Sequence, residues 1–278
     1  MRFTVVVSTR NRPDDLARAV ASVFAQTVGD VEAVVVDDGS DPVHRAAYDA
    51  IAQHYGARLR MFRLPSLRGG HGPAYRRNFG ASQSAADYIA FLDDGDTWTD
   101  PGFLAQITRG LDGERREIDG FHHLSTTVVD RAFFWRIGGF DETLHNEEAL
   151  DFHLRAIDAA GLVQHTPVEP ACHHVPTRTA TSPERWIAQL QMFNKAILFL
   201  HHHEIKDYAR HQKAHTMKRI AQKIWRNGDL NTALYYALRA FCLEPGLKWL
   251  LFCLRLWVGR LTCRPGQRAF GAAGQEPP

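Results

Sequence analysis

The chain has 278 residues, of which 45% are apolar and 23% charged, so its composition is that of a globular protein and excludes a largely disordered one. No apolar run reaches the roughly 18 residues needed to span a bilayer, and an apolar segment follows Met1 without a charged leader, which predicts a cytoplasmic protein. The net charge of +2 hides an asymmetry, because residues 206–278 carry 13 Lys and Arg against 4 Asp and Glu, whereas residues 1–205 carry 20 against 27. The two regions are therefore expected to face different partners.

Short β-branched segments alternate with helical patterns over residues 3–93. The expected strands lie at 3–8, 31–37, 58–64 and 88–93, and the expected helices at 16–26, 44–55 and 74–85. Short links and strands that are nearly all apolar are typical of a mostly parallel sheet that helices bury on both faces. The sequence thus predicts a Rossmann-like α/β domain.

Beyond residue 100 the pattern is less regular. The expected elements are a helix over 102–111, a strand over 118–129, a short helix over 131–137 and a helix over 147–161. Asp100 followed by Pro101 is a favourable helix start, and Asn146 is expected to cap the last of these helices.

The pattern becomes helical throughout from residue 183. Small residues and turn residues there match the spacing of the second half of a tetratricopeptide repeat: Ala221, Gly228, Ala233, Ala240 and Pro245. We therefore predict an α/β domain over 1–182 and an all-α appendage with one such unit over 183–263. The Gly-, Ala-, Pro- and Gln-rich tail, 264–278, is predicted to be disordered.

The segment 247–261 combines bulky apolar residues with Lys248, Arg255 and Arg260. It is too short and too charged to span a membrane, but it suits a helix that lies in a membrane interface. A helix that merely packs within the appendage explains the same pattern, and both interpretations remain open.

Histidines recur along the chain, and His211 and His215 have the spacing of one helical turn. Such a pair can bind a metal, but the sequence offers no evident carboxylate or cysteine partner, so we assign both to a helix surface. His173 and His174 follow a possible strand at 162–169 and are read either as loop residues or as an additional contact to a ligand.

Three of the expected strands end in polar residues. These ends are Ser8-Thr9-Arg10, Asp37-Asp38-Gly39-Ser40 and Asp93-Asp94-Gly95-Asp96. Because ligands of open parallel sheets bind outside the carboxyl ends of the strands, the three ends are expected to meet at one rim.

Each of these groups has a chemistry that suits a nucleotide. Asp38 can accept the imide N–H of a uracil, and Arg77 lies early in a helix, where phosphate oxygens are favoured. Asp94 and Asp96 offer the hard oxygen ligands that Mg²⁺ and Mn²⁺ take together with substrate phosphates. Taken singly, the same groups can form a capping turn, a solvated helix face and a solvated loop.

Five segments in order resemble the family-2 glycosyltransferases, which have the glycosyltransferase A fold. The segments are VVVSTRNRPDDLARAVASVFAQT, VEAVVVDDGSD, YRRNFGASQSAADYIAFLDDGDTWTDPGFL, GGFDETL and EEALDFHLR, and together they cover about residues 1–180. The resemblance implies a nucleotide diphosphosugar as donor, commonly UDP-linked, and Mn²⁺ or Mg²⁺ as cofactor. It also implies a single displacement at the anomeric carbon with inversion.

The resemblance assigns roles to individual residues. Ser8, Thr9 and Arg10 would line the base and ribose, and Asp38 would hold the base. Arg77 would lie near the phosphates together with the acidic loop, in which Asp93 and Asp94 face the donor and Asp94 and Asp96 bind the metal.

The implied acceptor is a glycan or a lipid-linked molecule, as in bacterial surface glycan synthesis. The basic helical region would then make peripheral contact with the inner face of the plasma membrane. Nucleic acid is not a predicted partner, because no recognition motif accompanies the basic tail.

The chain departs from the family pattern at two positions. The third acidic-loop position, usually an aspartate, is Gly95, so Asp94 and Asp96 would serve as a shifted pair. The position of the catalytic aspartate, six residues before Arg155, is Ala149, so the base is predicted to be the adjacent Glu148, with Glu147 as the alternative. A second hypothesis is a weak or inactive sugar-nucleotide-binding scaffold that partners an active transferase.

Overall fold

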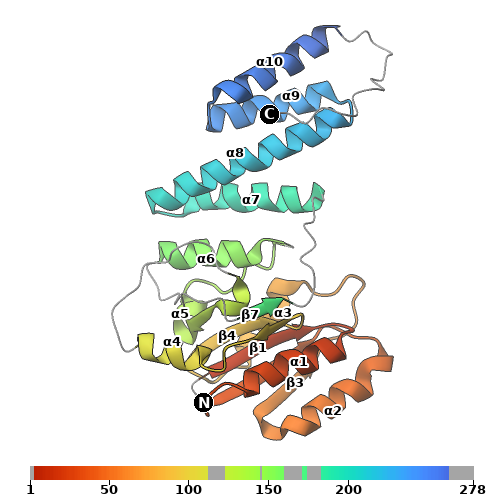
Figure 1. The fold of residues 1–278 in the computed structure, drawn as a ribbon, viewed down its shortest axis with the longest axis vertical. Helices are drawn as coiled ribbons and strands as arrows, with labels where there is room; N and C mark the ends of the chain where they lie inside the picture. Colours follow the sequence, from red (N-terminus) through yellow and green to blue (C-terminus); the bar gives the residue numbers. More distant parts are fainter. Residues whose placement is uncertain (1–2, 112–122, 145, 160–170, 174–182, 263–278) are drawn as a thin grey trace. The chain divides into compact units, whose positions relative to one another are not determined.

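The computed structural model describes residues 3–111, 123–144, 146–159, 171–173 and 183–262 (Figure 1). The chain forms two compact units, Met1–Ala180 and Thr181–Pro278. The first unit contains the sheet, and the described part of the second is helical.

A five-stranded sheet with the order β3-β2-β1-β4-β6 organises the first unit. Its strands are β1 (Phe3–Thr9), β2 (Val31–Asp37), β3 (Leu59–Arg63), β4 (Tyr88–Asp93) and β6 (Val128–Asp130). The first four are parallel and β6 runs antiparallel to β4, which confirms the predicted mostly parallel sheet. Every residue of β1 and β2 is buried, as expected of strands covered on both faces.

Helices cover both faces of this sheet (Figure 1). One face packs against α1 (Pro13–Phe24), α2 (Arg45–Tyr55) and α4 (Phe103–Leu111), and the other against α3 (Pro73–Ser82), α5 (Arg131–Arg136) and α6 (Glu148–Asp158). Short 3-10 turns η1 (Pro42–His44) and η2 (Gly56–Arg58) flank α2. The resulting arrangement is the predicted α/β sandwich.

Helix α1 illustrates how the local sequence fixes these elements. Proline at its first position needs no N–H partner, and two aspartates in its first turn complement the helix dipole. Its buried residues recur at the helical period and face the sheet: Leu16, Ala19, Val20 and Val23.

A buried polar network crosses the amino-terminal half of the sheet. Glu32 on β2 accepts a hydrogen bond from Thr4 on β1 at 2.7 Å and two from Arg60 on β3 at 3.1 and 3.2 Å. Ser84 donates to Thr4 at 2.7 Å, and Arg60 also donates to the carbonyl of Gln83 at 2.7 Å. One carboxylate thus joins three neighbouring strands and the segment after α3.

Two local predictions differ from the structure. The strand expected over 118–129 is, within its described residues, the 3-10 turn η3 (Leu124–Thr126) followed by β6. Helix α6 is preceded by Glu147 with φ +68°, and not by Asn146 as its cap, because the chain enters the helix through a left-handed residue.

A small second sheet lies beside the acidic loop. It pairs β5 (Asp96–Trp98) antiparallel with β7 (Ala171–His173). Trp98 is buried, and its indole N–H donates to the Ser125 carbonyl at 2.6 Å, so this ring supports the loop from the core side.

The second unit contains α7 (Pro183–Phe199), α8 (His203–Arg226), α9 (Leu230–Leu243) and α10 (Leu247–Thr262). Ala221 of α8 packs against α9, which in turn contacts Cys253 and Leu256 of α10. Asp229 caps α9 by accepting a hydrogen bond from the Thr232 N–H at 3.0 Å. None of the helices in the described part of the chain has the length and apolarity needed to cross a membrane.

Candidate active site

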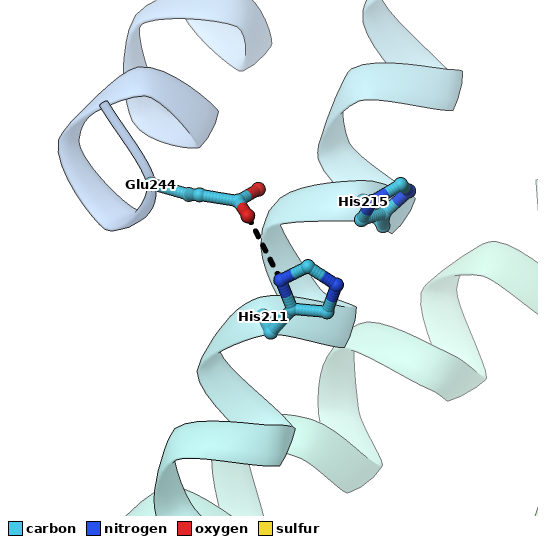
Figure 2. Close-up of side chains that lie close together, drawn as sticks. All are labelled: His211, His215 and Glu244. Carbon is cyan, nitrogen blue, oxygen red and sulfur yellow. Dashed lines mark ion pairs between the residues drawn. The ribbon is translucent and has the colours of Figure 1, made fainter. Parts of the chain in front are cut away.

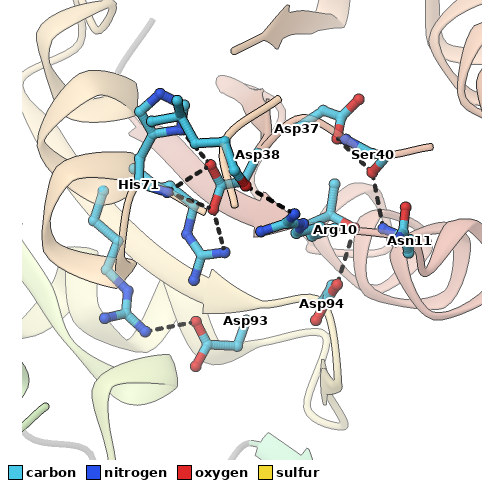
Figure 3. A network of polar contacts seen from close by, with 12 residues as sticks. Arg10, Asn11, Asp37, Asp38, Ser40, His71, Asp93 and Asp94 are labelled. Carbon is cyan, nitrogen blue, oxygen red and sulfur yellow. Dashed lines mark hydrogen bonds and ion pairs between the residues drawn. The ribbon is translucent and has the colours of Figure 1, made fainter. Parts of the chain in front are cut away.

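The carboxyl ends of β1, β2 and β4 meet at one rim of the sheet (Figure 3). Thr9 connects them, because its carbonyl accepts the Asp38 N–H at 2.9 Å and its hydroxyl donates to Asp94 Oδ2 at 2.9 Å. Ser8 lies beside Asp93 in the strand register. The structure therefore brings the strand-end residues together as the sequence predicts.

Asp38 lies at the bottom of this rim with 1% of its surface exposed. Its carboxylate accepts hydrogen bonds from the His71 backbone N–H at 3.1 Å and from Arg76 at 3.1 Å, and the His71 Nδ1 lies 2.6 Å from its Oδ1. His71 lies outside the motifs that predict the site. The glycines on either side of it were the available signal, since they allow the backbone to approach a carboxylate closely.

The remaining residues of the predicted base and ribose site line the same rim. Ser8 and Thr9 are buried, and the Thr9 hydroxyl also lies 3.2 Å from that of Tyr48. Arg10 is half-buried and donates to the Leu67 carbonyl at 3.1 Å. These contacts fix the segment that leaves β1 against the one that precedes α3.

Arg77 on α3 joins two carboxylates from different parts of the chain. Its guanidinium donates to Asp93 at 2.7 Å and to Glu148 at 2.5 Å, and all three groups are at least partly buried. Burial opposes the charged form of Asp93, but the adjacent Arg77 outweighs it and holds the Asp93 pKa below its ordinary value. Burial likewise opposes the charge on Arg77, yet Asp93 and Glu148 raise the pKa of its guanidinium.

Glu148 is the first residue of α6 and is buried, whereas Glu147 is partly exposed. The helix dipole favours a carboxylate at this position. Ala149 packs against the apolar core on the side of α6, and Arg155 donates to Asp151 and to the carbonyls of Ile137 and Gly139 at 2.6–2.7 Å. Glu148 is therefore tied to the rim through Arg77.

Asp94 and Asp96 have different surroundings. Asp94 is held by the Thr9 hydroxyl and lies 3.7 Å from Arg12, and its burial raises the pKa of its carboxyl. Asp96 accepts a hydrogen bond from the Ser125 hydroxyl and lies 3.7 Å from His123 Nδ1. The second carboxylate thus contacts the η3 segment, and His123 is a neighbour that the sequence left unassigned. His174 and the segment 162–169 lie outside the described residues, as does the tail at 264–278.

Replacing Asp94 with asparagine is expected to raise the free energy of unfolding at neutral pH. A pKa raised by burial means that folding disfavours the ionised carboxylate, and this penalty is absent in acid and grows as the pH rises above the ordinary value of about 3.9. Urea unfolding of the variant at several pH values between about 4 and 8 measures the gain. Asp93→Asn is the matched control. It should lower the free energy of unfolding at neutral pH, because Arg77 stabilises the ionised carboxylate of Asp93. A less stable Asp94→Asn protein at pH 7 would contradict the burial argument.

Solved structures with the same architecture define the class of fold. S. aureus TarS 1–349 in complex with UDP superposes with a TM-score of 0.62 at 17% identity, covering 94% of this chain and 87% of that one. The mannosyltransferase PcManGT from Pyrobaculum calidifontis, solved with GDP-Man and Mn²⁺, also gives 0.62 at 19% identity, covering 95% and 81%. The first unit accordingly has the glycosyltransferase A fold.

Residues 4–159 match the profile of glycosyl transferase family 2, and the chain belongs to that family. The succinoglycan biosynthesis protein ExoW of Rhizobium meliloti is 36% identical over 143 residues, which are 50% of this chain and 42% of the relative. The Campylobacter jejuni GalNAc(5)-diNAcBac-PP-undecaprenol beta-1,3-glucosyltransferase is 30% identical over 95 residues, 34% and 30% of the two chains. The chain thus spans less than half the length of these relatives.

Proposed function

We propose that the chain is an inverting glycosyltransferase that moves a sugar from a nucleotide diphosphosugar, with UDP as the nucleotide, to a hydroxyl acceptor. The observation that carries the proposal is the single rim on which Asp38, Asp94 and the Asp93–Arg77–Glu148 group meet. It combines a buried acceptor for a base, carboxylates for a cation and a further carboxylate for proton transfer. Family membership and a fold shared with UDP and GDP-Man complexes support it.

Donor binding would use the polar groups at the ends of β1 and β2. Asp38 accepts the imide N–H of the base, and Ser8, Thr9 and Arg10 surround base and ribose. In the structure His71 and Arg76 already contact the two oxygens of the Asp38 carboxylate. A bound nucleobase would therefore share this carboxylate with them or replace one of them. Arg77 orients Asp93 and Glu148, and its charge favours the nearby diphosphate.

Gly70 offers a test of the base site, because a Cβ there would collide with Asp38 Oδ2 and lie 2.7 Å from Arg10 Nη1. Gly70→Ala is expected to weaken UDP binding roughly 5–30-fold, the equivalent of about 1–2 kcal/mol. Gly69→Ala is the matched control, since Gly69 also has a positive φ, +90° against +80°, but an added Cβ would meet nothing within 4 Å. Calorimetric titration with UDP measures the affinity of both variants. Equal losses of affinity would show that Asp38 does not belong to the nucleobase site.

The acidic loop has the ligand chemistry of a Mn²⁺ or Mg²⁺ site. Both ions prefer carboxylate oxygens and substrate phosphates. The Asp94 carboxylate, whose ionised form is disfavoured by burial, would gain from an adjacent cation, so this residue fits the role. Asp96 would become a second ligand of the cation once its hydrogen bond from the Ser125 hydroxyl is broken. A bound cation would offset the negative charge that develops on the departing diphosphate.

Proton transfer in this mechanism belongs to Glu148, with Glu147 as the alternative base. The carboxylate takes the proton of the acceptor hydroxyl while the acceptor oxygen forms its bond to the anomeric carbon. The bond from that carbon to the diphosphate breaks on the opposite face, so the configuration inverts and a nucleoside diphosphate leaves. The hydrogen bond from Arg77 to Glu148 Oε1 would orient the carboxylate for this step.

The proposed acceptor is a growing or lipid-linked glycan in bacterial surface glycan synthesis, as the names of the two relatives suggest. Helix α10 would bring the enzyme to the inner face of the membrane. It buries Cys253 and Leu256 and leaves a second apolar stripe exposed, made up of Leu247, Leu250, Leu251, Leu254, Trp257, Val258 and Leu261. Lys248, Arg255 and Arg260 are exposed on the same helix and would favour anionic lipids.

Co-sedimentation with vesicles tests the membrane proposal. The wild-type chain is expected to bind phosphatidylserine vesicles, and Leu251→Asp/Leu254→Asp is expected to lose that binding while keeping its circular dichroism. Binding that is unchanged in this variant, or absent in the wild type, would rule out α10 as the contact.

Titration with UDP, GDP and TDP, each with and without Mn²⁺, tests the catalytic proposal together with a donor turnover assay. We expect UDP to bind most tightly, with a gain from Mn²⁺ that Asp94→Asn abolishes. Nucleotide binding without transfer or donor hydrolysis would favour the sugar-nucleotide-binding scaffold instead. Absence of nucleotide binding would contradict both functions.

A further inference from the structure

The helical unit brings together a group of metal-binding side chains that the glycosyltransferase chemistry does not use. His211 and His215 lie one turn apart on α8, and Glu244 follows directly after α9 (Figure 2). One ligand atom from each of the three residues lies within 4.8 Å of the others. The sequence shows the histidine pair, but the carboxylate is 29 residues beyond His215 and joins it through the packing of α9 on α8.

We propose that His211, His215 and Glu244 bind a divalent transition metal of the Zn²⁺ class. Two imidazoles and one carboxylate are a common donor set for this ion, which leaves its fourth position to water. The ligand atoms of a tetrahedral Zn²⁺ lie about 3.4 Å apart, since each bond is about 2.1 Å long. The three ligand atoms therefore need to approach one another by up to about 1.4 Å, which rotation of partly exposed side chains provides.

The surroundings of Glu244 favour this assignment. His211 Nδ1 lies 2.8 Å from Glu244 Oε1, and Lys218, one further turn along the same face of α8, pairs with Oε2. Lys218 thus holds the second oxygen of the carboxylate, as an outer partner of a metal ligand does.

The site is open to solvent, with side-chain exposures of 50% for His211 and 34% for Glu244, so an ion can enter without unfolding. A bound ion would connect α8 to the turn between α9 and α10. Because the ligands come from α8 and from the turn after α9, binding would stabilise the packing of the helical unit.

Cobalt and zinc titrations of the untagged full chain test the proposal. We expect one equivalent of Co²⁺ to give visible absorption bands of a four-coordinate site, and Zn²⁺ to displace it. His211→Ala and Glu244→Gln should each weaken Zn²⁺ binding at least about tenfold, measured by competition with a chromophoric chelator. These titrations are made in the Asp94→Asn background, which separates this site from the acidic loop.

His203→Gln is the matched control, because His203 is also exposed on α8 and pairs with a carboxylate, Asp207, at 2.9 Å. The Zn²⁺ affinity of the His203→Gln variant should equal that of the parent protein, which carries Asp94→Asn alone. His215→Ala provides a third variant if Glu244→Gln loses helicity by circular dichroism. Equal affinities in the parent and in His211→Ala or His215→Ala, or a loss in His203→Gln, would overturn the proposal.

Discussion

Glu148→Gln is expected to lower the turnover number of sugar transfer by roughly 10²–10⁴-fold, the usual contribution of a general base. Glutamine keeps the size of the side chain and an acceptor for the Arg77 N–H, which lies 2.5 Å from Glu148, but it cannot take a proton from the acceptor hydroxyl. Binding of the nucleotide should stay within a few-fold of the wild type, because the substitution changes neither the nucleobase site around Asp38 nor the acidic loop. Steady-state transfer kinetics and calorimetric titration with UDP measure the two quantities.

Glu147→Gln is the control for this prediction. Glu147 precedes α6 with φ +68° and is partly exposed, so its change should leave turnover within about twofold of the wild type. If Glu147→Gln abolishes transfer and Glu148→Gln does not, the base is Glu147. If neither variant changes transfer, proton removal is performed by another group and the proposed mechanism is wrong.

Replacing Arg77 with methionine is expected to lower the free energy of unfolding by about 3–5 kcal/mol, the typical effect of removing one partner from a buried ion pair. The substitution keeps an unbranched apolar side chain but leaves Asp93 and Glu148 without their shared counter-ion. Urea unfolding at pH 7 measures the loss. Activity should fall as well, since both carboxylates lose the group that positions them.

The pH dependence of this loss separates electrostatics from packing. Because Arg77 holds the Asp93 pKa below its ordinary value, the stabilisation is present above about pH 4 and disappears as the pH falls through the folded-state value. The stability difference between wild type and Arg77→Met should therefore narrow in acid. Arg18→Met, which removes an exposed partner of Asp15, should cost less than about 1 kcal/mol, and a similar cost for Arg77→Met would contradict the assignment.

The architecture of the sheet follows from patterns that are local in the sequence. The strands over 31–37 and 88–93 were predicted with the bounds that the structure has, because each is a largely apolar run ending in aspartate. The meeting of Asp38 and Asp94 followed from the general rule that parallel strands align their carboxyl ends. The strand bounds and the meeting of the two aspartates can therefore both be predicted from the alternation of strands and helices alone.

Contacts between segments far apart in the chain could not be predicted in this way. Arg77 was expected near phosphates, but the structure shows that it bridges Asp93 and Glu148, and the second of these lies 71 residues away. His71 reaches Asp38 only because the glycine-rich segment folds back across the strand end. Whether the shifted acidic loop and Glu148 support turnover depends on these distances and charges, which periodicity does not encode.

The buried Glu32 network also has a consequence for how the chain finds its fold. If β2 paired with its neighbours one residue out of step, Glu32 would turn to the face that holds Val31, Ala33 and Val35, away from Thr4 and Arg60. A carboxylate without partners among aliphatic side chains is costly, so misaligned pairings would dissociate before they could trap the chain. Parallel sheets assemble slowly from distant segments. A buried carboxylate that finds its partners in one register only therefore rejects misaligned pairings that the three consecutive valines of β2, residues 34–36, would tolerate.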